Sequence, residues 1–395
     1  MWWEKATAIT LDSVHPNLLN YKAHSASNFD ETDFIYLKAL WRNKSVDQFH
    51  INDYVRPEYV SKADEFVGQN PSPVSGQAQQ SLSPLRQSMI AFINTAAAPF
   101  GLDLPFNVEL GPFSLSKMLL DQAKRANNEG RDVGDTLKLF RRLDGPNQEG
   151  QNNTAAEHVP LDEQLTALTI GRPTSRSQTP GALDSEQDRS WDEEIVRLSL
   201  HSLLTSITLC SGNGDLDGRG ALEWVLTRQT FSLGLAGNIV YKVRTDGLLR
   251  NPENPNCRDP LVILDVKPYM RHLSRRNIEW QEACQMAAWI SETLRATSPE
   301  KRRAGVLTTS DDTNRRRRIL ISQNYRSLYI TVGEWGEGYE SYLKDGVRSA
   351  TLDQGNFLTM NCHGAYSLDN QEHMALFIRN LLALMMELSH PWEDK

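Results

Sequence analysis

The stretch Leu261-Val-Ile-Leu-Asp-Val-Lys-Pro268 decides the fold of this chain. Its four consecutive aliphatic residues, bounded by prolines, are typical of a strand that is buried on both faces. Because successive side chains of a strand point to opposite faces, Asp265 and Lys267 lie on the same face. A carboxylate and an ammonium at the end of a buried strand are costly to desolvate unless they have a partner or a task. We therefore expect a polar site where this strand ends.

A second carboxylate, Asp246, follows the preceding predicted strand. Residues Asn238–Val243 read as that strand, and Asp246 comes soon after its end. If the two strands are neighbours in the sheet, Asp246 and Asp265 converge at the same end of it. Two carboxylates at one place would offer the oxygen ligands that Mg²⁺ or Mn²⁺ prefers.

Helical patterns surround these strands and set the fold class. We expect a helix from Ser190, a candidate N-cap, because acids follow it at once and an apolar stripe runs to Ile207. Further elements are expected at three places: a helix over Ile278–Leu294, a hairpin of Ile319–Ser322 with Leu328–Val332, and a closing helix over Met374–Leu388. The order helix, strands, helix, strands, helix indicates an α/β or α+β core of about 200 residues.

Composition divides the chain into regions. Two stretches, 69–84 and 144–189, are rich in Ser, Gln, Pro and Gly and poor in aromatic residues, so we expect them to be disordered. The division that follows is an N-terminal region over 1–143, a linker over 144–189 and the α/β domain over 190–395. The N-terminal region is expected to be partly helical, in Phe34–Trp41 and in Leu85–Phe113.

Charge and cysteine content exclude several classes of protein. The chain has 395 residues and a net charge of −8, of which −6 falls on the first 189 residues, so nonspecific coating of nucleic acid is not expected. No secretory signal and no run of about 18 apolar residues is present, so we expect no membrane span. Four scattered cysteines without a CxxC pair suit a reducing compartment and argue against a zinc finger.

The order of acids, lysine and glutamine along the chain resembles the PD-(D/E)XK nuclease superfamily, and most closely the uncharacterised nuclease-like proteins of filamentous fungi. The resemblance covers Trp191 to about Leu388. The family pattern is a helix with an acid, a strand with Asp, a strand with (Asp/Glu)-x-Lys and a helix with Gln; its members here are Glu194 (or Glu193), Asp246, Asp265, Lys267 and Gln281. The resemblance implies a restriction-endonuclease-like core, with a central mixed sheet flanked by helices.

The same resemblance implies a role for each residue. Asp246 and Asp265 would hold Mg²⁺ or Mn²⁺, and Glu194 would bind a second ion or act through a water. Lys267 would orient the attacking water or stabilise charge on the phosphorus centre, and Gln281 would hydrogen-bond to the water, the lysine or a phosphate. The expected reaction is hydrolysis of phosphodiester bonds in nucleic acid, with DNA favoured. Gln285 stands where RecB-like members usually carry tyrosine, and its role is open.

Basic residues near the site suggest contacts with nucleic acid. Arg271, Arg275 and Arg276, together with His272, could contact phosphates that flank the cleavage point, although a solvated loop explains them equally well. The runs Lys301–Arg303 and Arg315–Arg318 have the spacing of a bipartite nuclear-localisation signal. We therefore expect a nuclear protein, or otherwise a cytoplasmic one.

Other interpretations compete with the nuclease. Keeping the family residues does not prove activity, so a catalytically inactive descendant that binds nucleic acid or protein is the first alternative, and a nuclease-type toxin or effector is the second. Acids in a first helical turn are also favoured by the helix dipole alone, which gives Glu194 a structural reading. His201 is expected to be structural, and the aromatic stretch Trp335–Tyr342 to pack in the core or to stack on bases.

Overall fold

The structure is a computed structural model, and it describes residues 24–25, 37–68, 84–95, 110–129, 193–212, 222–235, 238–252, 260–296, 305–307, 315–345 and 356–389. Residues 1–123 and 191–395 form one compact unit, and residues 124–190 form a second. Of the second unit only 124–129, the end of a helix, are described. The predicted linker 144–189 and nearly all of the stretch 69–84 lie outside the described residues.

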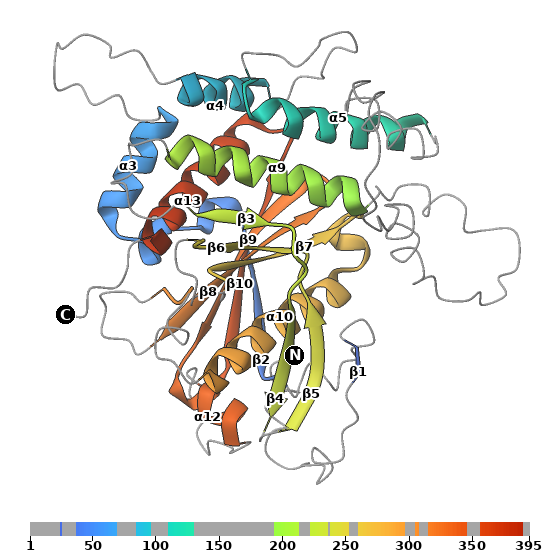
Figure 1. The fold of residues 1–395 in the computed structure, drawn as a ribbon, viewed down its shortest axis with the longest axis vertical. Helices are drawn as coiled ribbons and strands as arrows, with labels where there is room; N and C mark the ends of the chain where they lie inside the picture. The colour runs from blue at the N-terminus through green and yellow to red at the C-terminus, as the bar shows by residue number, and fades with distance from the viewer. Residues whose placement is uncertain are drawn as a thin grey trace, which may run out of the picture. The chain divides into compact units, whose positions relative to one another are not determined.

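A seven-stranded mixed sheet forms the centre of the first unit (Figure 1). Its strands, in order across the sheet, are β2 (Ala39–Lys44), β10 (Leu358–Ser367), β9 (Ser327–Trp335), β8 (Arg316–Asn324), β7 (Val262–Lys267), β6 (Gly247–Arg250) and β3 (Glu223–Val225). The pairs β2–β10 and β7–β8 are parallel and the others are antiparallel. The expectation of a central mixed sheet flanked by helices is thereby confirmed.

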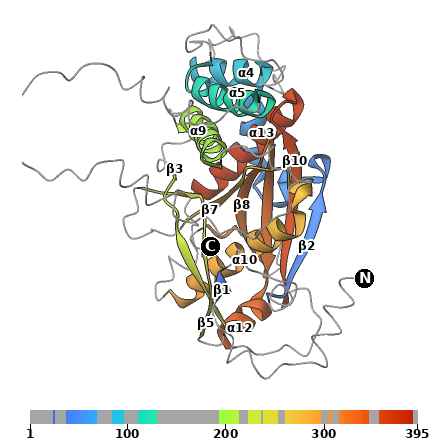
Figure 2. The same cartoon turned by 90° about the vertical axis from the view of Figure 1, so that its right-hand side faces the viewer.

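One face of this sheet is covered by α10 (Arg275–Arg295), which also packs against a second, smaller sheet. That sheet has the order β1 (His24–Ser25), β5 (Asn238–Arg244), β4 (Thr230–Leu235), and α10 lies between it and the large sheet (Figure 2). The approach of α10 to the large sheet is close, because a Cβ on Gly333 of β9 would lie 2.8 Å from Met286 Cγ. A short helix, α12 (Glu337–Asp345), packs beside α10.

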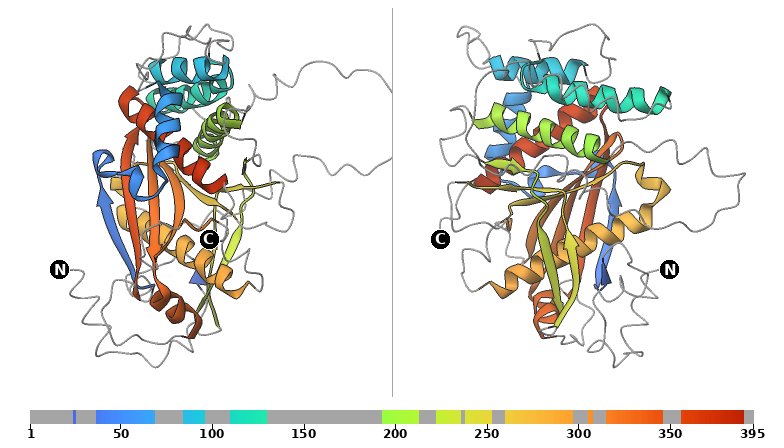
Figure 3. Two further views of the ribbon diagram at one scale, coloured as in Figure 1. Left: turned by 90° about the vertical axis from the view of Figure 1, so that its left-hand side faces the viewer. Right: turned by 45° about the vertical axis from the view of Figure 1, so that its right-hand side comes forward.

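The other face of the large sheet carries α9 (Glu193–Gly212) and α13 (Gln371–Ser389), as Figure 3 shows. The side chain of Gln323 reaches Ser199 of α9, while its neighbour Ser322 faces Arg271 on the opposite side. Over α9 and α13 pack three further helices: α3 (Pro57–Val67), α4 (Pro84–Thr95) and α5 (Phe113–Glu129). Short 3-10 turns connect these elements: η3 (Val46–Gln48), η4 (Ile51–Asp53) and η6 (Arg271–Leu273).

Most elements predicted from 190 onward are present. The two strands, the helix of residues 278–294, the hairpin and the closing helix are confirmed, and the hairpin is longer than predicted. The helix expected from Ser190 is α9, described from Glu193. The helical expectation for Phe34–Trp41 is wrong where it is tested, since residues 39–44 form strand β2. Trp335 and Tyr339 are buried, so this aromatic stretch packs in the core.

The N-terminal region belongs to the same compact unit as the predicted α/β domain. Strand β2 adds the edge of the large sheet beside β10, α3 packs against α13, and α4 packs against both α9 and α13. The chain therefore does not divide into an independent N-terminal region and a domain that begins at 190. Within the described residues, no helix is both long enough and apolar enough to cross a membrane.

Candidate functional site

The register of β6 and β7 brings the two aspartates to facing positions. Gly247 pairs with Leu264 across the antiparallel strands, and Asp246 precedes the first while Asp265 follows the second. The backbone N–H of Asp246 donates to the Leu264 carbonyl at 2.9 Å, which continues the pairing beyond the strand. Asp246 and Asp265 therefore converge as expected, but by another route: the predicted strand 238–243 is β5 of the small sheet and does not pair with β7, and the pairing is made by β6, which was not predicted.

Asp265 is completely buried and surrounded by donors from two elements. Its Oδ1 accepts hydrogen bonds from Gln281 Nε2 at 3.1 Å and from Gln285 Nε2 at 2.8 Å, both on α10. Lys267 Nζ lies 3.0 Å from Oδ1 and 2.9 Å from Oδ2. Apart from that ammonium, no described group donates a hydrogen bond to Oδ2. The two amides of α10 thus bind only Oδ1, and Oδ2 is left to its ion pair with Lys267.

Lys267 is buried with its ammonium held by the end of its own strand. Besides the two oxygens of Asp265, its Nζ donates to the Val266 carbonyl at 3.1 Å. Burial opposes the charged form, but the carboxylates of Asp265 and Asp246 outweigh it and raise the pKa of Lys267 above its ordinary value. The side chain is therefore a fixed cation at neutral pH.

Asp246 is held through both its carboxylate and its backbone carbonyl. Its Oδ2 accepts the N–H of Val266 at 2.9 Å, and its carbonyl accepts from Arg197 Nε at 3.0 Å. Burial, together with the nearby charge of Asp265, raises the pKa of Asp246 to about 6. Its second oxygen, Oδ1, faces Arg228 Nε at 3.6 Å. This oxygen therefore accepts no backbone hydrogen bond and faces a cation.

The first turn of α9 contributes two acids with different surroundings. Glu194 is more than half exposed and accepts hydrogen bonds from Arg197 Nη1 at 3.0 Å and from Arg228 Nη2 at 2.9 Å. Glu193 carries the negative charge that bears on both Asp246 and Lys267, raising the pKa of each. The structure thus commits Glu194 to two arginines and turns Glu193 toward the aspartates.

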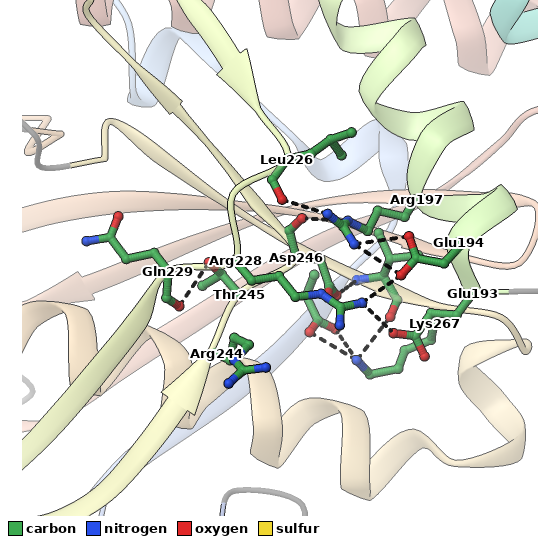
Figure 4. Close-up of polar contacts among 12 residues, drawn as sticks. Glu193, Glu194, Arg197, Leu226, Arg228, Gln229, Arg244, Thr245, Asp246 and Lys267 are labelled. Atoms are coloured by element: carbon green, nitrogen blue, oxygen red, sulfur yellow. Dashed lines mark hydrogen bonds and ion pairs between the residues drawn. The ribbon is translucent and has the colours of Figure 1, made fainter. Parts of the chain in front are cut away.

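Arg228 reaches the site from the segment that joins β3 to β4. Figure 4 shows its guanidinium between the acids of α9 and Asp246. Arg197 ties the same segment down, since its Nη2 donates to the Leu226 carbonyl at 2.6 Å. Sequence analysis did not single out either arginine, because neither stands in a motif or a periodic pattern.

Two amides from one helix bind the same oxygen, which answers the question left open for Gln285. Gln281 and Gln285 are one helical turn apart, so they lie on the same face of α10. Gln285 also bridges Asp265 to the Arg244 carbonyl, at 3.1 Å. The pair fixes the orientation of the Asp265 carboxylate.

Arg271 lies inside the protein instead of at its surface. Its guanidinium forms an ion pair with Glu282, donates to Asn324 Oδ1 and Ser322 Oγ at 3.0 Å each, and packs over the Tyr329 ring. A side chain that is 6% exposed and bonded in this way is not presented to a phosphate, so the expectation for Arg271 is corrected to a structural role.

The other predicted basic contacts lie at the start of α10. Arg275 and Arg276 are exposed, and Arg275 forms an ion pair with Glu279 at 2.7 Å. His272 is exposed beside them. Basic side chains in a first turn oppose the helix dipole, which favours acids there. These residues are therefore placed where an anion would relieve an unfavourable interaction.

The predicted nuclear-localisation signal is in part built into the sheet. Residues 316–318 belong to β8, and Arg318 is buried with its guanidinium 4.2 Å from the Trp289 ring centroid. Arg317 forms an ion pair with Glu334 at 2.7 Å. Lys301–Arg303 lie outside the described residues. A receptor could not bind the second run as an extended basic peptide, and a nuclear location stays a prediction.

His201 is half-buried, with its Nε2 3.0 Å from the Trp224 carbonyl, which agrees with the structural reading. Among the described residues, no group of three or more His, Cys, Asp or Glu side chains is arranged to hold a metal ion. Asp246 Oδ1 and Asp265 Oδ2 are nevertheless the two carboxylate oxygens least occupied by backbone and amide donors. One or two carboxylates with waters suffice for Mg²⁺, so this donor set fits that ion.

Sequence reasoning placed Asp246, Asp265, Lys267 and Gln281 together, and the structure brings these four into one site. Comparison of the chain with protein-family models, with curated proteins and with solved structures gives no match, and the function is therefore argued from the geometry of the site.

Proposed function

We propose that this protein is a metal-dependent nuclease that hydrolyses phosphodiester bonds, with DNA as the favoured substrate. The single observation that carries the proposal is the meeting of Asp246 and Asp265 beside the Lys267 ammonium, in a buried position at the end of β7. A protein interior tolerates two neighbouring carboxylates only when cations compensate them. An arrangement of this kind is costly to maintain and is typical of a functional site.

Asp246 and Asp265 would hold the divalent ion, through Oδ1 and Oδ2 respectively. Glu193 is a better candidate than Glu194 for an additional ligand or a water-mediated contact, because the Glu194 carboxylate is bonded to two arginines. When bound, the ion would supply Lewis acidity toward a phosphate and would lower the pKa of a water.

The side chains around the acids prepare the site for this chemistry. Gln281 and Gln285 keep Asp265 in one orientation, so little reorganisation is needed when a cation binds. Lys267 compensates the charge of the two aspartates from a fixed position. Arg275 and Arg276 provide exposed positive charge beside the site, where the phosphates of a nucleic acid would bind.

The test is cleavage of DNA, in parallel with RNA, with Mg²⁺ or Mn²⁺, by the unmodified protein and by Asp265→Ala and Lys267→Ala variants. We expect each variant to lose at least about 100-fold in rate, because each removes a charged group from the reacting centre. Lys242→Ala and Glu372→Gln, which change an exposed lysine and an exposed acid elsewhere, serve as matched controls and should keep full activity. Equal cleavage by all five proteins would mean that the activity lies elsewhere or is a contaminant.

A second candidate function is a non-catalytic module that binds nucleic acid or protein. The observation that favours it is internal charge compensation, since Lys267, Arg197 and Arg228 already neutralise the acids. This module would bind DNA in a salt-dependent way without metal-dependent turnover. Calorimetric titration with Mn²⁺ separates the two functions, because only the nuclease must bind the ion and lose this binding on Asp246→Ala.

A further inference from the structure

Two of the three cations at the site are anchored by backbone carbonyls. The Lys267 ammonium donates to Asp265 Oδ1 and to the Val266 carbonyl, and it forms an ion pair with Asp265 Oδ2 at 2.9 Å. Arg197 donates to the carbonyls of Asp246 and Leu226. Both side chains are therefore part of the framework of the site.

Arg228 differs from them, because each of its contacts within the described residues is to an acid. Its Nη2 lies 2.9 Å from Glu194 Oε1 and 3.7 Å from Glu193 Oε1, and its Nε lies 3.6 Å from Asp246 Oδ1. Its Nε is buried, and no described acceptor lies within hydrogen-bonding distance of it. The exposed fraction of the Arg228 side chain is 29%. Among the described residues, Arg228 is thus held only by acidic side chains, and it is partly exposed to solvent.

Arg228 also faces the oxygen that a metal ion would need. Asp246 Oδ2 is taken by the Val266 N–H, so Oδ1 is the oxygen that remains for a cation. A guanidinium and a divalent ion at the same oxygen repel each other strongly where the surroundings are partly desolvated. Arg228 and the ion are therefore alternative partners of Asp246.

We propose that Arg228 is a displaceable counter-ion of the site, which releases Asp246 when a divalent cation binds and then binds a phosphate oxygen of the nucleic acid. This inference rests on the proposed nuclease function and adds a substrate-binding residue to it. The phosphate role follows from anchoring and exposure, since Lys267 and Arg197 are bonded to backbone carbonyls and have 11% and 14% of their side chains exposed, against 29% for Arg228. A guanidinium presents a planar fork of N–H groups that matches a phosphate, and it is carried on a long side chain with several rotatable bonds.

The first experiment measures Mn²⁺ binding by isothermal titration calorimetry, without nucleic acid, in the unmodified protein and in Arg228→Gln, Arg228→Lys and Arg250→Gln variants. Removing the competing charge should tighten Mn²⁺ binding at least about tenfold in Arg228→Gln. Arg228→Lys keeps the charge and should bind within about threefold of the unmodified protein. Arg250, an exposed arginine at the other end of β6 that pairs with Glu223, is the matched control and should change nothing.

The second experiment measures kcat/KM for DNA cleavage at saturating Mn²⁺. Arg228→Gln should lose at least about tenfold although it binds the ion more tightly, because the phosphate contact is gone. Arg228→Lys should recover part of the loss as a point charge without the fork. Opposite changes in ion affinity and catalytic efficiency are not expected from a residue that merely supports the fold.

The possible failures are distinguishable. Absence of both Mn²⁺ binding and cleavage in the unmodified protein would overturn the nuclease function, and this inference with it. Binding and cleavage by the unmodified protein, with equal or weaker binding by Arg228→Gln, would overturn this inference alone. If Arg228→Gln does not fold, the displacement is tested in the unmodified protein by modification of its arginines with phenylglyoxal. Arg228 should react faster when Mn²⁺ is present. An unchanged rate of modification would contradict the displacement.

Discussion

At the scale of single residues, His363 shows how a polar side chain is kept neutral by its surroundings. It is completely buried on β10, with its ring tilted against that of Phe49 at a centroid distance of 4.3 Å and its Nε2 3.5 Å from the Tyr54 hydroxyl. Burial lowers the pKa of His363 to about 3, and the positive charges of Lys44 and His50 add to the effect. An unfolded chain would protonate this histidine near its ordinary pKa of about 6.5.

This difference predicts a loss of stability on acidification. Since the folded pKa is depressed, the unfolded state binds the extra proton between about pH 6.5 and 3, and stability falls as the pH falls through that window. From pH 7.5 to 5 the contribution is about 2 kcal/mol. The free energy of unfolding, measured by urea denaturation, should fall between about pH 7.5 and pH 5 in the unmodified protein. In His363→Gln this fall should be smaller by about 2 kcal/mol. A parallel pH dependence in the two proteins would contradict the assignment, and His272→Gln, an exposed histidine, serves as the control.

What sequence could predict at this scale depends on distance along the chain. Asp265 and Lys267 were placed correctly because the period of a strand fixes which neighbours share a face. Asp246 was expected near Asp265 from the strand before it, but that strand is β5 of the small sheet; the two aspartates meet because the unpredicted strand β6 pairs with β7. Arg228 was not found, since it meets Glu194 across 34 residues from a segment without a periodic pattern. The burial of Arg271 depends on Ser322 and Asn324 of another strand, which no local signal in its own loop reveals.

At the scale of secondary-structure elements, a buried ion pair fixes α10 against the sheet. Arg271 lies in η6, just before the helix, and Glu282 lies in its third turn, at the same level as the glutamines that bind Asp265. Through Asn324 and Ser322, the Arg271 guanidinium joins the helix to β8. The position of Gln281 and Gln285 on Asp265 thus depends on the ion pair between Arg271 and Glu282.

The stability losses from removing Arg271 and from removing Glu282 should not add up. Arg271→Met or Glu282→Leu alone leaves an uncompensated charge in the interior, and we expect each to lower the free energy of unfolding by about 3–5 kcal/mol. The double variant leaves no buried charge, so its loss should be well below the sum of the two single losses. Urea denaturation of the four proteins gives the coupling energy. Strictly additive losses would show that the two side chains do not interact in solution.

Two of the strands that sequence analysis missed, β10 and β2, pair with each other across most of the chain. Strand β10 carries Asn361 and His363 among its apolar residues, so its pattern is not that of a regular buried strand. The first residues of strand β2 fall in Phe34–Trp41, which was expected to be partly helical. Its strand conformation comes from parallel pairing of Ala39–Lys44 with Leu358–His363, more than 300 residues away in sequence. Tertiary pairing of this kind overrides local propensity.

At the scale of the whole molecule, the compact unit is assembled from both ends of the chain. The N-terminal residues supply the edge strand beside β10 and three helices that cover α9 and α13. Apolar side chains of α13 such as Leu382 and Met386 are buried, and α3 and α4 pack against this helix. The composition of 144–189 predicted a linker between two parts of the sequence, but it did not show that these parts fold together. Composition reports whether a segment can bury a core, and not which core it joins.

This architecture makes a prediction about fragments. A fragment of residues 190–395 lacks the strand that covers the edge of β10 and the helices that pack on α13, so we expect it to be insoluble or unfolded when expressed alone. Co-expression with residues 1–143 should rescue it as an equimolar, soluble complex with a cooperative unfolding transition. Val60→Asp, which places a charge on the buried face of α3, should abolish the rescue, while Ser61→Asp on the exposed face of that helix should not. A fragment 190–395 that unfolds alone with the same midpoint as the full chain would show that the N-terminal residues are dispensable for the fold.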